Sequence, residues 1–539
     1  MRARALAVLL VTGWSATGFA QEAHRHAEPS RALGSVSFPN SGAAEAQAPF
    51  LRGIALLHSF EYDDAAESFR AAERADAKFA LAYWAEALTY SKLLWGLDDV
   101  PGARAALARL APTAAERLAL ARTARERAYG AAVEAFYADT NVSRRSLAYA
   151  DSMRHLAQRY PADQEAAAFA SVALLMAGTS AELPPGQDTL FRNEAIALAT
   201  RVFDANPRHP GAAHYLIHAY DDPAIAARGL AFARAYARIA PDAEHALHMP
   251  SHIFVQVGLW DDVVRSNEQA WAASRAAAAR HGDSVAQLDF HALEWLQYGY
   301  LEQGRAAAAR ALIDTAAAVL RGIDLSDDPD MRFAVADLTF AYAAATGRWD
   351  AAAALRAPPP PAADASVRQR VFTRIAAFQA AYSAAMRGDS AQAMAGVRAL
   401  QQSVASLPAG APNHQRILFL TAQLEAAMAD RLGDHARAAE LLARWADFDN
   451  RSSPIGPPWY PPVGEQLGNA LLAAGRPREA AAAYEAALGA RANRSEALAG
   501  IVTARRQAGD VAPAAAARRK LLANWHAADS EVRRRIPAP

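Results

Sequence analysis

The chain contains no cysteine among its 539 residues. Disulfide bonds, thiolate metal sites and a cysteine nucleophile are therefore excluded. A transition metal bound by this chain would need histidine, carboxylate or water ligands.

The chain also carries no net charge. Lys and Arg together number 56, as do Asp and Glu, so the formal net charge is zero. This balance gives no electrostatic reason to expect a nucleic acid or an anionic membrane surface as a partner. The sequence has no Gly-rich phosphate loop, no Gly-x-Ser-x-Gly elbow and no His-Glu-x-x-His motif. It therefore lacks the signatures of P-loop proteins, α/β-hydrolases and many zinc peptidases.

The apolar run at the N-terminus is short. The stretch ALAVLLV (5–11) is too short to span a bilayer, and we predict no membrane span. Arg2 and Arg4 precede this run, and the small residues near Ala20 follow it. This pattern predicts a signal peptide over residues 1–20, hence an exported protein that is periplasmic or secreted. An uncleaved N-terminal helix is the alternative. Residues 21–46 are expected to be a flexible lead-in.

A helical pattern recurs along the rest of the chain. An apolar stretch, a glycine, one or two polar residues and an Ala-rich stretch follow one another, as in LGDHARAAELL (432–442) and AGRPREAAAAYEAAL (474–488). The glycine suits a turn between two helices because it tolerates the left-handed conformation. Pro207 and Pro241 lie 34 residues apart, which is the period of a tetratricopeptide repeat.

These repeats predict an all-α fold, a tetratricopeptide-like α-solenoid of helical hairpins. The stretch APPPPAADAS (357–366) is too rich in proline to be helical. We therefore predict two arrays, residues 47–356 and 371–539, joined by a Pro-rich linker at residues 357–370.

Histidines gather on three successive predicted helices. The stretch AEHALHMPSHIF (243–254) holds three of the 15 histidines of the chain. The first helix of each hairpin lines the concave surface of such a solenoid, so these side chains would project into one groove. Pro250 is expected to kink the middle helix and re-aim its last histidine. The seven side chains are His214, His218, His245, His248, His252, His291 and Glu294.

This convergence predicts a site for a divalent transition metal. Two histidines four residues apart on a helix are a common way to present two ligands to one ion. Zinc, copper and iron all accept imidazole and carboxylate ligands. If the site is catalytic, Glu294 would act as a base toward a metal-bound water. A metal-free groove for a peptide, and a structural polar network between packed helices, are the alternatives.

Further residues near the predicted groove are weaker candidates. His58, Trp84, His209 and Tyr215 are expected to contribute to ligand binding, although aromatic residues at helical spacing also fit a core.

Four carboxylates have simpler interpretations. Asp163 and Glu165 most simply supply favourable charge at a helix N-terminus, and their alternative role is as metal ligands or as a general base. Asp221 and Asp222 are expected to cap a helix that begins at Pro223.

The chain resembles a family of exported bacterial tetratricopeptide repeat proteins. The resemblance implies a tetratricopeptide solenoid with a His-rich inner segment, and it implies no particular reaction. Pro461 and Pro462 depart from the family's more usual aromatic-Pro arrangement, which makes the packing there harder to infer. The function predicted is metal binding in the concave groove, and the alternative is a non-enzymatic protein or peptide scaffold in the cell envelope. The blocks that carry the resemblance are FLRGIALLHSFEYDDAAESF (50–69), LAYWAEALTYSKLLWG (81–96), HPGAAHYLIHAYDDP (209–223), IAPDAEHALHMPSHIFVQVGLWDDVVRSNEQA (239–270), HALEWLQYGYLEQG (291–304) and PPWYPPVGEQLGNALLAAGRPREAAAAYEAAL (457–488).

Overall fold

The recurring glycine lies where one helix of a hairpin ends. In the hairpin of α23 (Val463–Ala473) and α24 (Pro477–Ala490), Gly475 has a φ of 72°. Glycine adopts this left-handed conformation without the steric cost that a Cβ would bring. Pro477 then fits the first turn of α24, where its missing N–H is not needed.

A computed structural model describes residues 32–92, 94, 97–180, 182–282, 285, 288–325, 329–361, 367–405, 412–452 and 456–537. The predicted signal peptide, residues 1–20, and residues 21–31 of the predicted lead-in lie outside the described residues.

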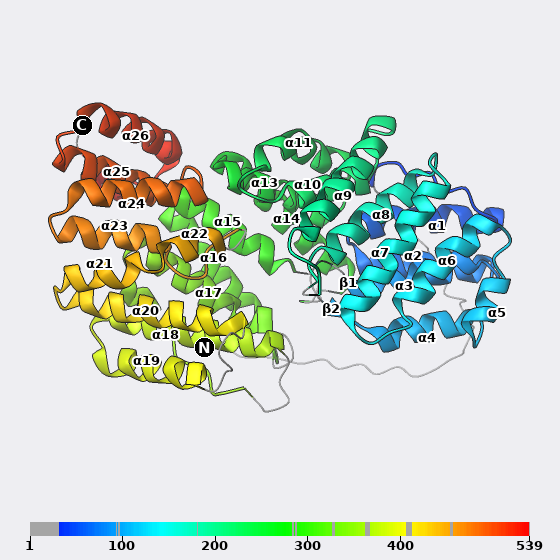
Figure 1. The fold of residues 1–539 in the computed structure, drawn as a ribbon, viewed down its shortest axis with the longest axis horizontal. Coiled ribbons are helices and arrows are strands. Elements are labelled where there is room, and N and C mark those ends of the chain that lie inside the picture. Colours follow the sequence, from blue (N-terminus) through cyan, green and yellow to red (C-terminus); the bar gives the residue numbers. More distant parts are fainter. Residues whose placement is uncertain are drawn as a thin grey trace, which may run out of the picture. The chain divides into compact units, whose positions relative to one another are not determined.

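The described chain is almost entirely helical (Figure 1). Its first helices are α1 Ala44–His58, α2 Tyr62–Ala75, α3 Ala80–Thr89, α4 Val100–Leu110, α5 Ala114–Ala119, α6 Ala124–Phe136, α7 Val142–Arg159, α8 Gln164–Ala177 and α9 Gln187–Ala205. The middle helices are α10 Pro210–Tyr220, the 3₁₀ helix η2 Ala226–Gly229, α11 Leu230–Ile239, α12 Glu244–His248, α13 Pro250–Val257, α14 Trp260–Arg280, α15 Phe290–Glu302, α16 Ala306–Val319, α17 Pro329–Thr346 and η4 Trp349–Ala352. The last are α18 Val367–Arg387, α19 Ser390–Ala405, α20 Pro412–Arg431, α21 His435–Ala443, α22 Ala446–Ser452, α23, α24, α25 Ser495–Gln507, α26 Val511–Asn524, η5 Trp525–Ala527 and α27 Ser530–Arg534.

Within the described residues the only strands are β1 (Ser91–Lys92) and β2 (Leu97–Asp98), which pair antiparallel. Consecutive helices pack on one another along most of the chain, from α1 on α2 to α25 on α26. The fold is therefore an all-α, tetratricopeptide-like solenoid, as the repeats predict. No helix in the described ranges is long and apolar enough to cross a membrane.

The hydrophobic packing divides at α14 and α15. One core runs from Leu33 to Tyr298, and a second runs from Val264 to Val532. Phe340 of α17 and Phe378 of α18 belong to the same second core, with ring centroids 6.4 Å apart. The division therefore does not fall at residues 357–370, where the sequence predicts a linker. Proline stops a helix, but the apolar faces of α17 and α18, on either side of the Pro-rich stretch, still pack in one core.

The predicted flexible lead-in is also corrected where it is described. Leu33 and Phe38 are buried. The backbone N–H of Ser35 donates to the carbonyl of Arg208 over 2.9 Å. Residues 32–43 are therefore extended but packed, and α1 begins at Ala44, inside the predicted lead-in.

The C-terminal helices return to the middle of the chain (Figure 1). Trp260 of α14 donates its indole N–H to the carbonyl of Asn493 over 2.9 Å. The N–H of Asp529 donates to the carbonyl of Gly304 over 3.0 Å. This return encloses a cavity of about 1400 Å³, whose lining residues range along the chain from Phe60 to Arg535.

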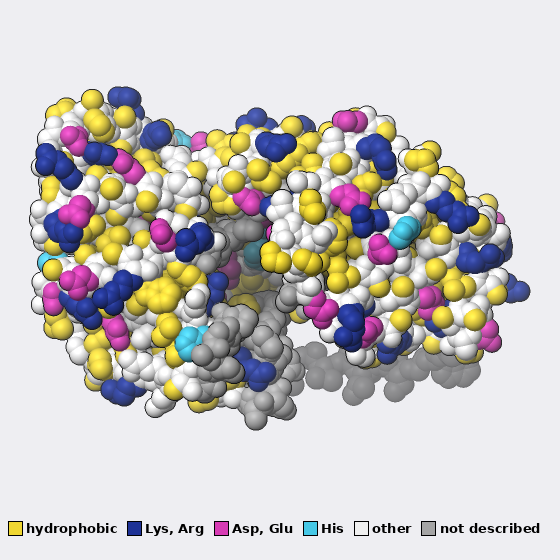
Figure 2. All heavy atoms as spheres, viewed as in Figure 1, with side chains coloured by type: hydrophobic (Ala, Val, Ile, Leu, Met, Phe, Trp, Pro, Cys, Tyr) yellow, Lys and Arg dark blue, Asp and Glu magenta, His cyan; other side chains and the backbone are white. Residues whose placement is uncertain are grey.

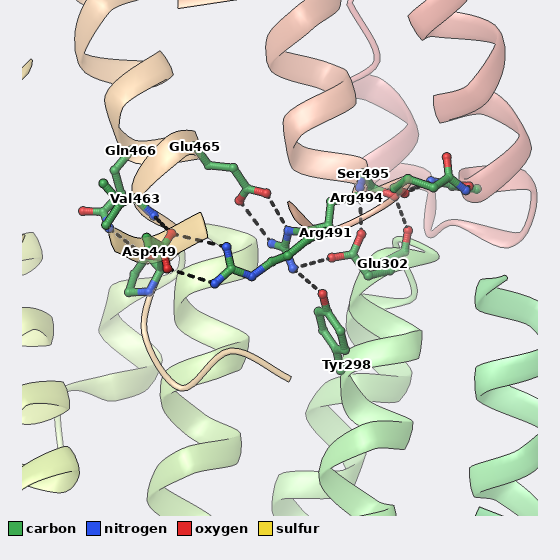
Figure 3. A network of polar contacts seen from close by, with 12 residues as sticks. Tyr298, Glu302, Asp449, Val463, Glu465, Gln466, Arg491, Arg494 and Ser495 are labelled. Carbon is green, nitrogen blue, oxygen red and sulfur yellow. Dashed lines mark hydrogen bonds and ion pairs between the residues drawn. The ribbon is translucent and has the colours of Figure 1, made fainter. Parts of the chain in front are cut away.

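A buried polar network fastens this return (Figure 3). The Arg494 guanidinium lies 2.9 Å from Glu302 Oε1 and donates to the Tyr298 hydroxyl over 2.6 Å. It also donates to Glu465 Oε2 over 3.1 Å. Ser495 donates its N–H to Glu302 over 2.7 Å. The network ties α15 to the segments that begin α23 and α25.

Candidate metal centre

Four short helices position the histidines. His209 caps α10, because its Nδ1 accepts the N–H of Ala212 over 3.1 Å. Asp289 caps α15 in the same way, accepting the N–H of Ala292 over 2.9 Å. Pro250 splits the middle helix into α12 and α13, as predicted. The Ser251 hydroxyl satisfies the carbonyl of His248 at the break, over 2.7 Å.

The structure sorts the six predicted histidines into two groups of three. We call His214, His218 and His245 the first triad, and His248, His252 and His291 the second triad. In each triad one nitrogen of every ring lies within 4.8 Å of the other two. The sequence predicts one shared site. The break at Pro250 instead leaves His245 with the first triad, while His252 lies in the second.

The first triad is centred on His214. Its Nδ1 donates to the backbone carbonyl of His58 over 2.7 Å, so its Nε2 carries no proton. The Nε2 atoms of His218 and His245 lie 3.0 and 3.2 Å from that Nε2. Tyr236 stacks on the His214 ring, with centroids 5.0 Å apart. This packing holds the central ring in place.

The second triad has two rings whose protons are assigned by their partners. Asn267 donates its Nδ2 to the carbonyl of Val263 over 2.8 Å, which leaves its Oδ1 facing His248. His248 Nδ1 therefore donates to Asn267 over 2.7 Å. His252 Nδ1 donates to the Asp221 carboxylate over 2.7 Å. When each ring is in its neutral form, its Nε2 lone pair is left bare.

These two bare nitrogens face each other across 3.1 Å. Two lone pairs at that distance repel unless a cation lies between or beside them. Nitrogens bound to one zinc ion at roughly 2.0–2.1 Å in tetrahedral geometry lie about 3.3–3.4 Å apart. The pair His248–His252 at 3.1 Å and the two pairs around His214 at 3.0 and 3.2 Å come close to this spacing. The rings are thus arranged as ligands of one ion would be.

Burial favours the neutral imidazole, which is the form that binds metal, at His214, His218, His245, His248 and His291. Burial first, and then His291 and His252, hold the pKa of His248 well below its usual range. Burial also lowers the pKa of His291 to about 3, with His252 adding to the effect. The pKa of His218 is likewise lowered to about 3, by burial and then by His252.

Both triads reach the cavity. His218, His245, His252 and His291 line it, and His291 is the most exposed of the four. Trp295 stacks on His252 with ring centroids 4.3 Å apart. Gly456 lies so close to Trp295 that a Cβ there would stand 2.3 Å from the indole. Gly456 therefore packs against Trp295, which in turn stacks on a ring of the second triad.

The weaker groove candidates lie in the core instead. Trp84 and Tyr215 are each 1% exposed, and His58 and His209 are fully buried. His58 Nδ1 accepts the Tyr215 hydroxyl over 2.8 Å, and its Nε2 donates to Glu165 over 2.7 Å. The groove prediction for these four residues is corrected, because their rings fill the space between packed helices.

Glu165 has the position that its simpler interpretation requires, at a helix N-terminus. It lies in the first turn of α8 and is fully buried. Burial alone would raise the pKa of its carboxyl, but His209 and His58 outweigh burial and hold that pKa well below its usual range. His58, Glu165 and His209 form a third compact group. Their hydrogen bonds, including the Ser37 N–H at 3.2 Å, make it a structural polar network.

Glu294 joins neither triad. It lines the cavity together with Asp337 of α17. Burial, and then Asp337 and Asp289, raise the pKa of Glu294 well above its usual range. A raised pKa makes the ionised carboxylate a stronger base and lets the protonated group serve as an acid. The role of Glu294 as a base therefore stays a prediction.

The buried carboxyl group of Asp337 should make the stability of the folded protein depend on pH. Its Oδ1 is buried and accepts no hydrogen bond from the described residues, and burial raises its pKa to about 7. The unfolded chain loses this proton at lower pH, so the folded protein loses stability as pH rises from about 4 to about 7. Asp337→Asn removes this loss and should raise the unfolding free energy at about pH 8 by about 1 kcal/mol or more, since a tenfold change in acidity corresponds to about 1.4 kcal/mol.

Urea unfolding of both proteins at about pH 4 and about pH 8 measures this difference. Asp314→Asn is the matched control, because that side chain is 67% exposed. An Asp337→Asn advantage that is the same at both pH values would contradict the prediction.

Sequence reasoning missed the residues that hold the rings. Asp221 is predicted to cap a helix that starts at Pro223, but turns and η2 occupy that stretch, and Asp221 holds His252 instead. Asp222 accepts the N–H of Ala224 over 2.9 Å. The position of Asp221 three residues after His218 was a usable signal for a supporting carboxylate. Nothing in the sequence marks Asn267.

Figure 2 shows Lys and Arg side chains interspersed with Asp and Glu over the described part of one face.

No family model matches the sequence, and no curated protein matches it. Among solved structures, the chain is similar to the human IFIT1 dimer with m7Gppp-AAAA, at 12% identity and a TM-score of 0.33, covering 92% of each chain. It is also similar to yeast Tom70, at 11% identity and a TM-score of 0.28, covering 91% of this chain and 96% of that one. Likenesses this low carry no argument about function.

Proposed function

We propose that this protein binds a divalent transition metal ion, zinc, copper or iron, through His248, His252 and His291. The observation that carries the proposal is the pair of bare Nε2 atoms 3.1 Å apart in the second triad. A single added proton could relieve that repulsion by bridging two of the nitrogens. Three converging nitrogens fit a metal ion better, because a proton is shared between two atoms only.

The surroundings of the second triad also support a metal ion. Ligating histidines usually donate their other N–H to a carboxylate or an amide or carbonyl oxygen, which fixes the tautomer. Asp221 and Asn267 serve His252 and His248 in this way. Gln256 donates to the second oxygen of Asp221 over 3.2 Å, which fixes the carboxylate in turn.

The same geometry favours a reactive ion. Three protein ligands leave a fourth coordination position, as in catalytic zinc sites. That position would open to the cavity, because His252 and His291 line it. A bound ion there would lower the pKa of a coordinated water. Glu294, on the same helix as His291, would act as the base toward that water.

Elemental analysis of the purified protein tests metal binding. We expect the wild type to retain zinc, copper or iron after dialysis, and the His252→Ala and His291→Ala variants to retain less. His155→Ala is the control, since that side chain is 71% exposed and distant in sequence from the triads. Metal content as low in the wild type as in the two triad variants would contradict the proposal.

Asp221→Asn makes a graded test of the same site. The amide keeps the size of the side chain but removes the charge that holds His252 in its tautomer. Loss of such a supporting group weakens metal affinity about 10–100-fold. Competition with a chromophoric chelator measures the affinity, with Asp222→Asn as the neighbouring control. Equal affinities for the two variants would show that Asp221 does not support a ligand.

A non-enzymatic scaffold is the second candidate function. Solenoids of this kind present extended concave surfaces to peptides and proteins. The size of the cavity and its aromatic lining, which includes Trp349, Tyr382 and Trp459, favour this candidate. Affinity capture from a cell-envelope extract, compared with His291→Ala, distinguishes the two. Partners retained by both proteins, with no metal in either, would favour the scaffold. We also propose that residues 1–20 direct export of the protein, so an envelope extract is the appropriate source of partners. N-terminal sequencing of the mature protein would test this export.

A further inference from the structure

We infer that the first triad is a second metal site, and that the protein binds two divalent transition metal ions side by side at one wall of the cavity. The inference rests on the proposed function, because it assigns the same chemistry to His214, His218 and His245.

Hydrogen bonding alone does not account for the first triad. His214 Nε2 has one lone pair, which lies in the plane of its ring, because its Nδ1 proton is donated to the carbonyl of His58. Both His218 and His245 direct an Nε2 at it, over 3.0 and 3.2 Å. One lone pair accepts one well-aligned N–H, so one of the two contacts would remain unsatisfied. A cation among the three nitrogens satisfies all of them.

Aromatic packing holds the rings of the first triad in place. Phe60 packs against all three rings, with centroids 4.4 Å from His214, 5.8 Å from His218 and 5.4 Å from His245. Phe60 itself is a non-glycine residue with a φ of 58°, a backbone conformation that costs free energy. Such packing fixes the nitrogens before any ion arrives.

The two triads adjoin each other. The ring centroids of His245 and His248 lie 6.2 Å apart, and those of His218 and His252 lie 6.3 Å apart. Asp221 stands between the triads, because it binds His252 directly and its charge acts on His218. This carboxylate would offset part of the repulsion between two dications.

Each ion would be held by three imidazoles and would complete its coordination with an oxygen donor from the cavity. His218 and His245 of the first triad line the same cavity as His252 and His291 of the second. One small ligand with two oxygen donors could therefore reach both ions, which is the arrangement of two-metal sites.

Equilibrium dialysis against buffered zinc, followed by elemental analysis, counts the ions. We expect two zinc ions per wild-type chain, one in His218→Ala, one in His291→Ala and none tightly bound in the double variant. His218 and His291 are chosen because they face the cavity, and circular dichroism would show whether each variant keeps its helices. His155→Ala should bind two.

The outcomes separate the two proposals. One zinc ion in the wild type, lost in His291→Ala and kept in His218→Ala, would overturn the second site and leave the proposed function standing. No zinc in the wild type would overturn both. Two ions in His218→Ala would place the second ion elsewhere and would also overturn the inference. Substitution with cobalt gives an independent readout, because loss of one triad should remove one set of absorption bands.

Discussion

Saturating zinc is expected to stabilise the folded protein by about 4 kcal/mol for each occupied triad, when the free ion is about 1000 times its dissociation constant. The triads exist only in the native fold, because their ligands come from helices spread over residues 214–291. Binding free energy therefore becomes folding free energy. Removal of the ion by a chelator should reverse the effect.

Thermal unfolding with zinc, and with zinc plus excess EDTA, measures this stabilisation. The double variant His218→Ala, His291→Ala is the control, since each triad would then keep only two of its rings. Zinc should raise the midpoint of the wild type and leave that of the double variant nearly unchanged. An equal rise in both proteins would show that zinc acts at other sites.

Arg494→Met should be among the most destabilising single substitutions in the C-terminal half. The guanidinium of Arg494 is buried and contacts Glu302, Glu465 and Tyr298 (Figure 3). Methionine keeps much of the side-chain length but leaves two carboxyl groups without their cation. Removing one partner of a buried ion pair costs about 3–5 kcal/mol.

The matched control is Arg505→Met. Arg505 pairs with Glu485 over 2.7 Å, but Glu485 is 44% exposed. An exposed pair of this kind contributes about 0–1 kcal/mol. The midpoints of urea unfolding should therefore differ strongly between the two variants, and equal midpoints would contradict the account of the buried network.

The helical repeats were predictable because they depend on local sequence. The glycine before Pro477 ends one helix, and the alanines after it form the next, without help from distant residues. The position at which the hydrophobic packing divides into two cores was not predictable from local sequence. The prolines at residues 358–361 prevent a continuous helix, but the burial of Phe340 against Phe378 depends on how the chain folds around them.

The candidate site was predictable in composition and only partly in arrangement. Helical spacing brings His214 and His218 to one face, and the structure agrees. Spacing alone also places His245 with His248 and His252. The helix breaks at Pro250, and His245 lies in the first triad while His248 and His252 lie in the second. Whether an inner-helix histidine faces a cavity or a core depends on the neighbouring helices. His58 and His209 therefore resemble groove residues in sequence and are buried in the structure.

The supporting residues were the least predictable part. Asn267 lies on α14, and its role depends on its amide donating to Val263 while accepting from His248. That arrangement requires the packing of α14 against α12, which no local pattern reveals.

The most direct test is anomalous diffraction at the zinc edge from crystals grown with zinc. We expect an anomalous peak within roughly 2.0–2.1 Å of the Nε2 atoms of His248 and His252, and a second beside His214 Nε2. An anomalous map with no peak at either triad, at a zinc concentration that saturates binding in solution, would contradict the proposal that these histidines are metal ligands.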